Sequence, residues 1–187
     1  MDNDGRQAIE SLHKERVMQK EPDFGLLNSQ TDERYGSRRY GLLGTVAKNG
    51  CGMIALYNIE RAADDRTRFE PYYAARKQIK TNLFGLLGTR PSVVAKNLRK
   101  KGFEVVPFRP KDAEKAEAFD GVIVLSWYLF GAHYVAGIGN SSGTYTFYNE
   151  FARPRSMKLT EFLKNAAATK QHPIRIWGIR FPKKDEQ

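Results

Sequence analysis

Apolar residues recur at helical spacings in the first half of the chain, and in the second half they form short runs or alternate with polar residues. The first pattern predicts amphipathic helices and the second predicts strands. The predicted helices span residues 6–19, 51–63, 69–81, 89–102 and 158–167, and the predicted strands span residues 103–108, 121–129, 132–139, 144–150 and 173–181. Helices followed by an antiparallel sheet indicate an α+β domain.

The start of the chain differs from the rest. Residues 6–19 have a helical composition with only a loose apolar face, and the stretch after them is polar and rich in turn-forming residues. We therefore expect an arm and linker at 1–39 and one domain at 40–187, because a chain of 187 residues suits a single core. The apolar stretch FGLLNSQ at 24–30 is a candidate pro-segment that occupies a cleft. The alternative is a disordered tail.

The composition, with 41% hydrophobic and 12% aromatic residues, is that of a globular protein. No run of about 18 apolar residues is present, so we expect no membrane span. The first 25 residues contain no apolar core of a signal peptide. We expect a cytoplasmic protein, with export by a non-classical route as the alternative.

The net charge is +10 at pH 7, and it is unevenly distributed. Residues 1–40 hold seven Lys and Arg against eight Asp and Glu, whereas residues 41–187 hold 24 against 13. A basic domain attracts acidic partners, which include nucleic acid, anionic lipid, cell-wall polymer and acidic peptides. The aromatic residues fall at alternate, core-like positions, and no helix has the spacing that reads bases, so we do not expect a nucleic-acid partner.

Cys51 is the only cysteine and lies between two glycines at the predicted start of a helix. The positive end of the helix dipole and the unpaired N–H groups there favour a thiolate, and Asn49 is a plausible cap. Flanking glycines, including Gly52, would let a substrate backbone approach. The alternative is a cysteine that fills the core as a small hydrophobe. One cysteine forms no internal disulfide and no two-cysteine metal site. Hydrolysis through a thiol needs neither a metal nor another cofactor, and we expect none.

A thiolate nucleophile needs a base, and the chain has three histidines, of which His13 and His172 lie in polar segments. His133 begins an apolar strand and is expected at the rim of the sheet. If Gly139 pairs with Gly143 across a tight turn, the returning strand places Asn149 opposite His133. A register one residue longer places Glu150 there. Either side chain would orient the imidazole ring.

Three segments, NGCGMIALYN, GAHYVAGI and YTFYNE, occur in the order Cys, His, Asn. Together with GTRPSVVAKNLRKKGFEV they resemble the papain-like cysteine peptidases of bacteria, in particular the compact type that processes bacteriocins with double-glycine leaders. The resemblance covers roughly residues 40–181. It implies a papain-like fold and a peptide or other amide substrate. It also implies Cys51 as nucleophile, His133 as base and then acid, and Asn149 as the orienting residue.

One feature departs from that family. Its members commonly carry a glutamine about six residues before the cysteine, whose amide helps to bind the oxyanion. Here that position is Thr45, and no glutamine occurs between residues 31 and 77. Thr45 or Asn49 would have to donate in its place, and the loss of one such donor typically costs about 100- to 1,000-fold in rate. A non-catalytic binding module of the same fold, with a basic partner-binding face, is therefore the alternative function.

Overall fold

The computed structural model describes residues 23–76, 88–129 and 131–183. The helical half contains β1 (Arg39–Tyr40), β2 (Gly44–Thr45), α2 (Val46–Asn49), α3 (Cys51–Ala63), α4 (Phe69–Arg76) and α5 (Pro91–Arg99). The second half contains β3 (Glu104–Phe108), η2 (Pro110–Asp112), α6 (Ala113–Ala116), β4 (Gly121–Tyr128), β5 (Gly131–Gly139), β6 (Tyr145–Tyr148), β7 (Arg155–Met157), α7 (Leu159–Ala168) and β8 (His172–Arg180). The fold is α+β, as the sequence pattern predicts.

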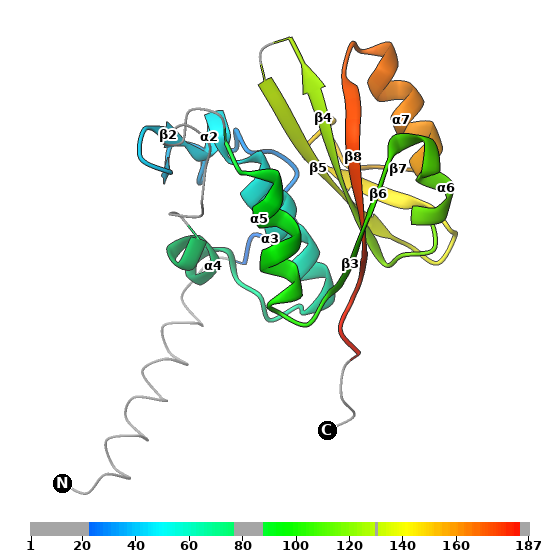
Figure 1. Ribbon diagram of the computed structural model, residues 1–187. Coiled ribbons are helices and arrows are strands. Elements are labelled where there is room, and N and C mark those ends of the chain that lie inside the picture. Colours follow the sequence, from blue (N-terminus) through cyan, green and yellow to red (C-terminus); the bar gives the residue numbers. More distant parts are fainter. Residues whose placement is uncertain (1–22, 77–87, 130, 184–187) are drawn as a thin grey trace, which may run out of the picture.

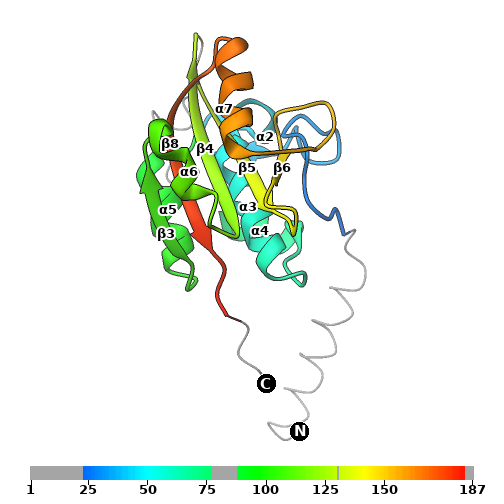
Figure 2. The same ribbon diagram turned by 90° about the vertical axis from the view of Figure 1, so that its right-hand side faces the viewer.

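Six strands form one antiparallel sheet in the order β3-β8-β4-β5-β6-β7. Helices α3, α4 and α5 lie on one side of the sheet (Figure 1), and α6 and α7 lie on the other (Figure 2). Because both faces are covered, β4 is buried along most of its length and reads as a continuous apolar run. Its side chains alternate between the two cores: Ile123 and Leu125 face the α3 side, while Val122 and Val124 face the α7 side.

The predicted elements agree with the structure except at their ends. The helix predicted at 51–63 is confirmed as α3, whereas the one predicted at 89–102 begins at Pro91 and ends at Arg99. The strand predicted at 144–150 ends at Tyr148, because Asn149 adopts a left-handed backbone conformation with φ of 67°. The helix predicted at 6–19 and the last residues of the one at 69–81 lie outside the described residues.

Part of the predicted arm belongs to the core. Leu27 and Tyr35 are 1% and 0% exposed and pack with α3 and α4. The side chain of Asn58 on α3 accepts from Leu27 N and donates to Leu27 O, both at 2.8 Å. The expected boundary at residue 40 therefore falls within packed structure. Within residues 24–30, Leu27 contacts α3, whereas Asn28 and Gln30 hydrogen-bond the loop after β6 and line the cavity beside His133. That this segment regulates the site as a pro-segment stays a prediction.

Candidate functional site

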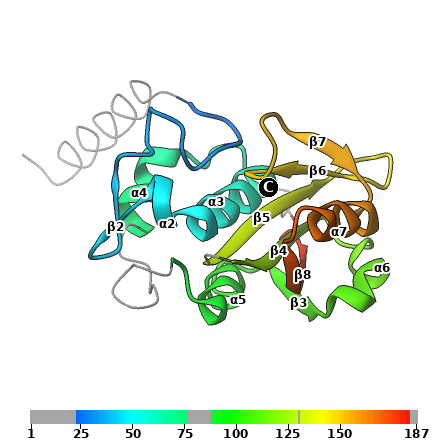
Figure 3. The ribbon, with the colours of Figure 1, turned by 90° about the horizontal axis from the view of Figure 1, so that it is seen from above.

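Cys51 is the first residue of α3, which lies along β5 (Figure 3). It follows the short helix α2 and a single linking residue, Gly50. The thiol is 5% exposed, and its Sγ lies 3.9 Å from the carbonyl oxygen of Ala132 on β5. The cysteine therefore sits at the positive end of a 13-residue helix and against the strand that carries His133.

The two glycines beside Cys51 have packing roles. A Cβ on Gly50 would lie 2.5 Å from Val46 O, and a Cβ on Gly52 would lie 2.4 Å from Thr89 Oγ1. Thr89 is held in place by a 2.6 Å hydrogen bond between its hydroxyl and that of Tyr40. Gly52 therefore has a packing role against Thr89, and the expectation that it lets a substrate approach stays a prediction.

The ring of His133 is bound on one side by two acceptors. Its Nε2 lies 2.6 Å from the main-chain oxygen of Asn149 and 3.4 Å from Oε2 of Glu150. Because a carbonyl oxygen only accepts, Nε2 carries a proton. The ring also interacts with the side chain of Cys51. Burial lowers the pKa of His133, but the hydrogen bonds and charges of Cys51 and Glu150 outweigh burial and raise this pKa to about 10.

Asn149 meets His133 through its backbone and not through its side chain. The side-chain Oδ1 accepts from Gln30 N at 2.8 Å, and Nδ2 lies 3.3 Å from Gln30 Oε1 and 3.5 Å from Tyr134 O. The expected contact between the Asn149 side chain and the His133 ring is therefore absent from the hydrogen bonds described. The main-chain carbonyl of Asn149 and the carboxylate of Glu150 lie beside the ring nitrogen in its place. That carboxylate is in turn held by Gln171 Nε2 at 2.7 Å.

Both predicted hairpin registers are wrong. Gly139 pairs with Tyr145, so neither Asn149 nor Glu150 lies directly opposite His133. The cause is the turn, in which Asn140 Oδ1 accepts from the backbone of Ser142 at 3.1 Å and of Thr144 at 3.2 Å. Such an Asx turn lengthens the loop beyond the tight turn that was expected. The positive φ of Asn149 then directs its carbonyl group to the ring.

Two cavities flank the Cys51–His133 pair and share Tyr128. The one on the cysteine side has a volume of about 190 Å³ and is lined by Cys51, Asn49, Lys48, Trp127, Ala132 and Ile174, among others. The one on the histidine side has a volume of about 480 Å³ and is lined by His133, Asn149, Glu150, Gln30 and Gln171, among others. Trp127 and Ile174 are 53% and 50% exposed, so the first cavity opens beside an apolar surface.

The candidate oxyanion donors have different surroundings. Asn49 lines the cavity that contains Cys51. Thr45 caps α2, since its Oγ1 accepts from Lys48 N at 3.4 Å. The hydroxyl of Thr45 thus has a structural partner in the helix before Cys51, and of the two candidates only Asn49 lines that cavity.

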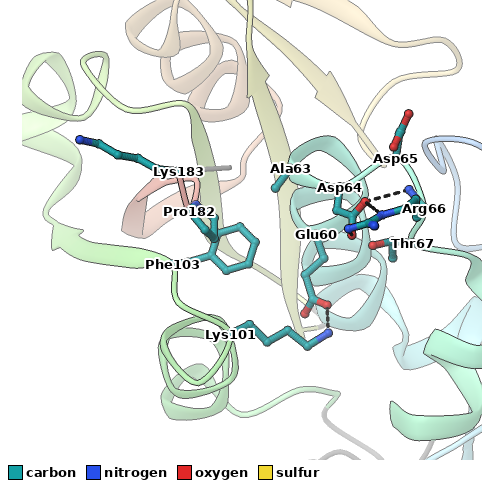
Figure 4. Close-up of a pocket in the computed structure, with 10 residues that line it drawn as sticks. All are labelled: Glu60, Ala63, Asp64, Asp65, Arg66, Thr67, Lys101, Phe103, Pro182 and Lys183. Carbon is teal, nitrogen blue, oxygen red and sulfur yellow. Dashed lines mark hydrogen bonds and ion pairs between the residues drawn. The ribbon is translucent and has the colours of Figure 1, made fainter. Parts of the chain in front are cut away.

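A third cavity lies at the opposite end of α3, with a volume of about 550 Å³ (Figure 4). Its most buried acid is Glu60, 3% exposed, which pairs with Lys101 and, at 3.4 Å, with Arg76. The hydroxyl of Tyr72 lies 3.4 Å from the same carboxylate. Two cations therefore compensate one buried charge and link α3 to α4 and to the end of α5. This group is distant from Cys51 along α3, and we assign it a structural role.

Gln30 is the residue near the site that sequence reasoning missed. It contacts both Asn149 and the residue Ala47 of α2. The apolar stretch at 24–30 was expected in a cleft as a whole, but the segment has no periodicity that singles out Gln30.

Two further observations concern ligands and membranes. No group of three or more His, Cys, Asp or Glu side chains within 23–76, 88–129 and 131–183 is arranged to hold a metal ion. In the same part of the chain, no helix has the length and apolar character that crossing a bilayer requires.

Comparison with known proteins gives a similar solved structure but no similar sequence family. No protein-family model and no curated protein matches the chain. Among solved structures, the chain is similar to the peptidase domain of Streptococcus ComA, a bifunctional ABC transporter involved in a quorum-sensing pathway. The TM-score is 0.50 with 14% sequence identity, over 76% of this chain and 99% of that domain. At this identity the likeness concerns the fold, and the structural neighbour is a peptidase domain.

Proposed function

We propose that this protein is a bacterial cysteine peptidase or amidase of papain-like type, related to the peptidases that process double-glycine leaders. The observation that carries the proposal is the position of Cys51 at the start of α3, with its Sγ 3.9 Å from the carbonyl oxygen of Ala132, the residue before His133. The Nε2 of His133 is in turn held by Asn149 O and Glu150. A cysteine at a helix start, a histidine base and an orienting acceptor make up the constellation of thiol hydrolases. The likeness in fold to a peptidase domain supports it.

The reaction follows from these positions. His133 holds the proton that the Cys51 thiol has given up, and the thiolate attacks the carbonyl carbon of the scissile amide to form a tetrahedral oxyanion. That intermediate collapses as His133 gives the proton to the leaving nitrogen, so the C–N bond breaks and a thioester on Cys51 remains. Water then attacks the thioester with His133 as base, releasing a carboxylic acid and the thiol. An amine in place of water would give transfer through the same thioester.

The acceptors on the far side of the ring divide two tasks. The neutral carbonyl of Asn149 fixes which nitrogen keeps its proton, leaving Nδ1 to exchange a proton with Cys51. The charged Glu150 stabilises the imidazolium that forms when the thiol is deprotonated. The oxyanion would be bound by the N–H of Cys51 at the helix start and by the side chain of Asn49, which lines the same cavity.

The substrate is a peptide or a related amide. Its acyl part would lie in the cavity beside Cys51, where Trp127 and Ile174 supply apolar walls and Lys48 supplies a cation at the rim. With a net charge of +10, the protein attracts acidic chains more strongly than basic ones. An acidic residue near the scissile bond is therefore favoured.

The second candidate is a non-catalytic binding module that uses the same cavity and the basic surface. It is favoured by Thr45, which stands where the family has its glutamine and which serves as a helix cap. Such a module would keep the fold and the cavity but would have no need of a reactive thiol.

Alkylation distinguishes the two candidates, and the single cysteine makes the label unambiguous. The peptidase predicts that iodoacetamide labels Cys51 at pH 7 faster than it labels free cysteine, and that His133→Ala lowers this rate while Cys51→Ser abolishes labelling. A wild-type rate equal to or below that of free cysteine favours the binding module.

A further inference from the structure

Gln30 connects the two halves of the candidate site through three hydrogen bonds. Its main-chain N–H donates to Asn149 Oδ1 at 2.8 Å, and its Oε1 lies 3.3 Å from Asn149 Nδ2. Its Nε2 donates to the carbonyl oxygen of Ala47 at 2.7 Å. Asn149 carries the carbonyl that binds His133, and Ala47 lies in the helix that leads into Cys51.

The orientation of both amide groups follows from these partners. The Ala47 carbonyl only accepts, so the Gln30 atom facing it is Nε2 and the atom facing Asn149 is Oε1. The backbone N–H of Gln30 only donates, so the Asn149 atom facing it is Oδ1. The Asn149 amide thus accepts from the backbone N–H of Gln30 and donates to its side-chain Oε1, with no conflict between donors and acceptors.

This pair acts on the turn that directs the Asn149 carbonyl group. Asn149 has φ of 67°, a left-handed conformation that asparagine adopts more readily than most residues other than glycine. Its side chain is only 7% exposed, and its described partners are Gln30 and Tyr134 O. The same turn sets the position of Asn149 O, 2.6 Å from His133 Nε2. Gln30 therefore holds Asn149 in place, and Asn149 O in turn orients the ring of His133.

We infer that Gln30 is a positioning residue, which holds the His133 acceptor and the Cys51 helix at their working separation. The inference rests on the proposed function and goes beyond it, because it assigns a role to a residue of the N-terminal segment. The role is not oxyanion binding, since Nε2 of Gln30 is already bound to Ala47 O. Gln30 acts on reactivity only through Asn149 and α2.

The test compares Gln30→Met with Asn28→Ala in the full chain. Methionine keeps the length of glutamine and removes both polar side-chain atoms. Asn28 is a matched control because its Nδ2 joins the same two segments, donating to Phe151 O at 3.1 Å and to Ala152 O at 3.2 Å, without touching Asn149 or Ala47. The readouts are the rate of Cys51 alkylation by iodoacetamide at pH 7, the NMR titration of His133, and the melting temperature.

We expect Gln30→Met to lower the alkylation rate by about 10- to 100-fold, as small misplacements of reacting groups do. It should also shift the titration of His133, whereas Asn28→Ala should lower only the melting temperature. A Gln30→Met protein that is folded and labels like wild type overturns the inference and leaves the proposed function standing. A wild-type rate no faster than that of free cysteine removes the reactive pair and the positioning role together.

A second variant applies if Gln30→Met does not fold. Gln30→Glu keeps the shape and one acceptor for Asn149 Nδ2, but it places a carboxylate oxygen against Ala47 O in place of the donor. We expect it to lower the alkylation rate as well. Wild-type labelling by folded Gln30→Glu shows that the bond to Ala47 O has no role in reactivity and overturns the inference that Gln30 holds the Cys51 helix in place.

Discussion

At the scale of residues, His133 depends on two acceptors of different kinds. The Asn149 carbonyl at 2.6 Å is neutral, whereas the Glu150 carboxylate at 3.4 Å carries a charge. A hydrogen bond to a carbonyl orients the ring, and a nearby negative charge stabilises its protonated form. The pKa of His133, raised to about 10 despite burial, keeps the ring protonated through the neutral range.

Replacing Glu150 with glutamine tests this division. Glu150→Gln removes the charge, so the imidazolium loses a partner and the pKa of His133 falls toward its usual value. An NMR titration of the ring resonances follows this change in a protein with three histidines. The control is Glu104→Gln on β3, where the carboxylate is 60% exposed and pairs with Arg180. An equal His133 pKa in wild type and Glu150→Gln would show that the carboxylate is not the source of the shift.

Single residues were predictable from the sequence where the signal is local. Cys51 stands out as the only cysteine at a helix start, and His133 as the histidine at the start of an apolar strand. The role of Asn149 was not predictable, because it depends on the sign of φ and on the length of the Asx turn at Asn140. Gln30 carries no periodic signal at all.

At the scale of elements, α3 and the segment before α5 are in direct contact next to Cys51. A Cβ on Gly52 would lie 2.5 Å from Thr89 Cβ and 2.4 Å from its Oγ1. Thr89 cannot retreat easily, because Tyr40 binds its hydroxyl at 2.6 Å and Tyr134 binds its carbonyl oxygen at 2.9 Å. The start of the cysteine helix is therefore set by close backbone packing.

Gly52→Ala should lower the free energy of unfolding by about 1 to 3 kcal/mol, the usual cost of overpacking a core. The double variant Gly52→Ala/Thr89→Gly tests the cause, because removing the Thr89 side chain makes room for the new methyl group. In urea unfolding, the double variant should lose less stability than the sum of the two single variants. Additive losses would mean that the two positions do not clash.

The long elements were predictable from periodicity, and the short ones were not. β4 and α3 have apolar patterns that fix both their type and their extent. The four-residue helix α2 and the two-residue strands β1 and β2 have too few positions to show a period. Their existence depends on tertiary contacts, such as the backbone bond from Ala47 N to Gly36 O at 2.9 Å.

At the scale of the whole molecule, the segment from Asp23 to Gly36 packs against α3 and α4 of the helical half. It contributes Leu27 and Tyr35 to the core and Gln30 to the site. Sequence composition indicated an arm here, because polar and turn-forming residues surround the few apolar anchors. What the composition does not show is that a few anchors suffice to dock this segment, among them Leu27, which is hydrogen-bonded to α3, and Gln30, which is hydrogen-bonded to Asn149.

Two leucine variants test whether this segment belongs to the fold. Leu27→Ala should lower the free energy of unfolding by about 2 to 5 kcal/mol, as expected for a leucine that is 1% exposed. Leu43→Ala, at a position 64% exposed, should change it little. Equal small effects in chemical denaturation would show that residues near Leu27 dock only loosely.

The central claim, a Cys51 thioester in amide hydrolysis, is tested most directly by cleavage of a peptide mixture. Wild type, Cys51→Ser and His133→Ala are incubated with one mixture in ¹⁸O-labelled water, and mass spectrometry reads new carboxyl termini and the mass of the Cys51 peptide after acid quench. We predict new termini carrying ¹⁸O and an acyl adduct on Cys51 in wild type only. New termini that persist in Cys51→Ser, or a folded wild type that produces neither termini nor adduct, would contradict the account.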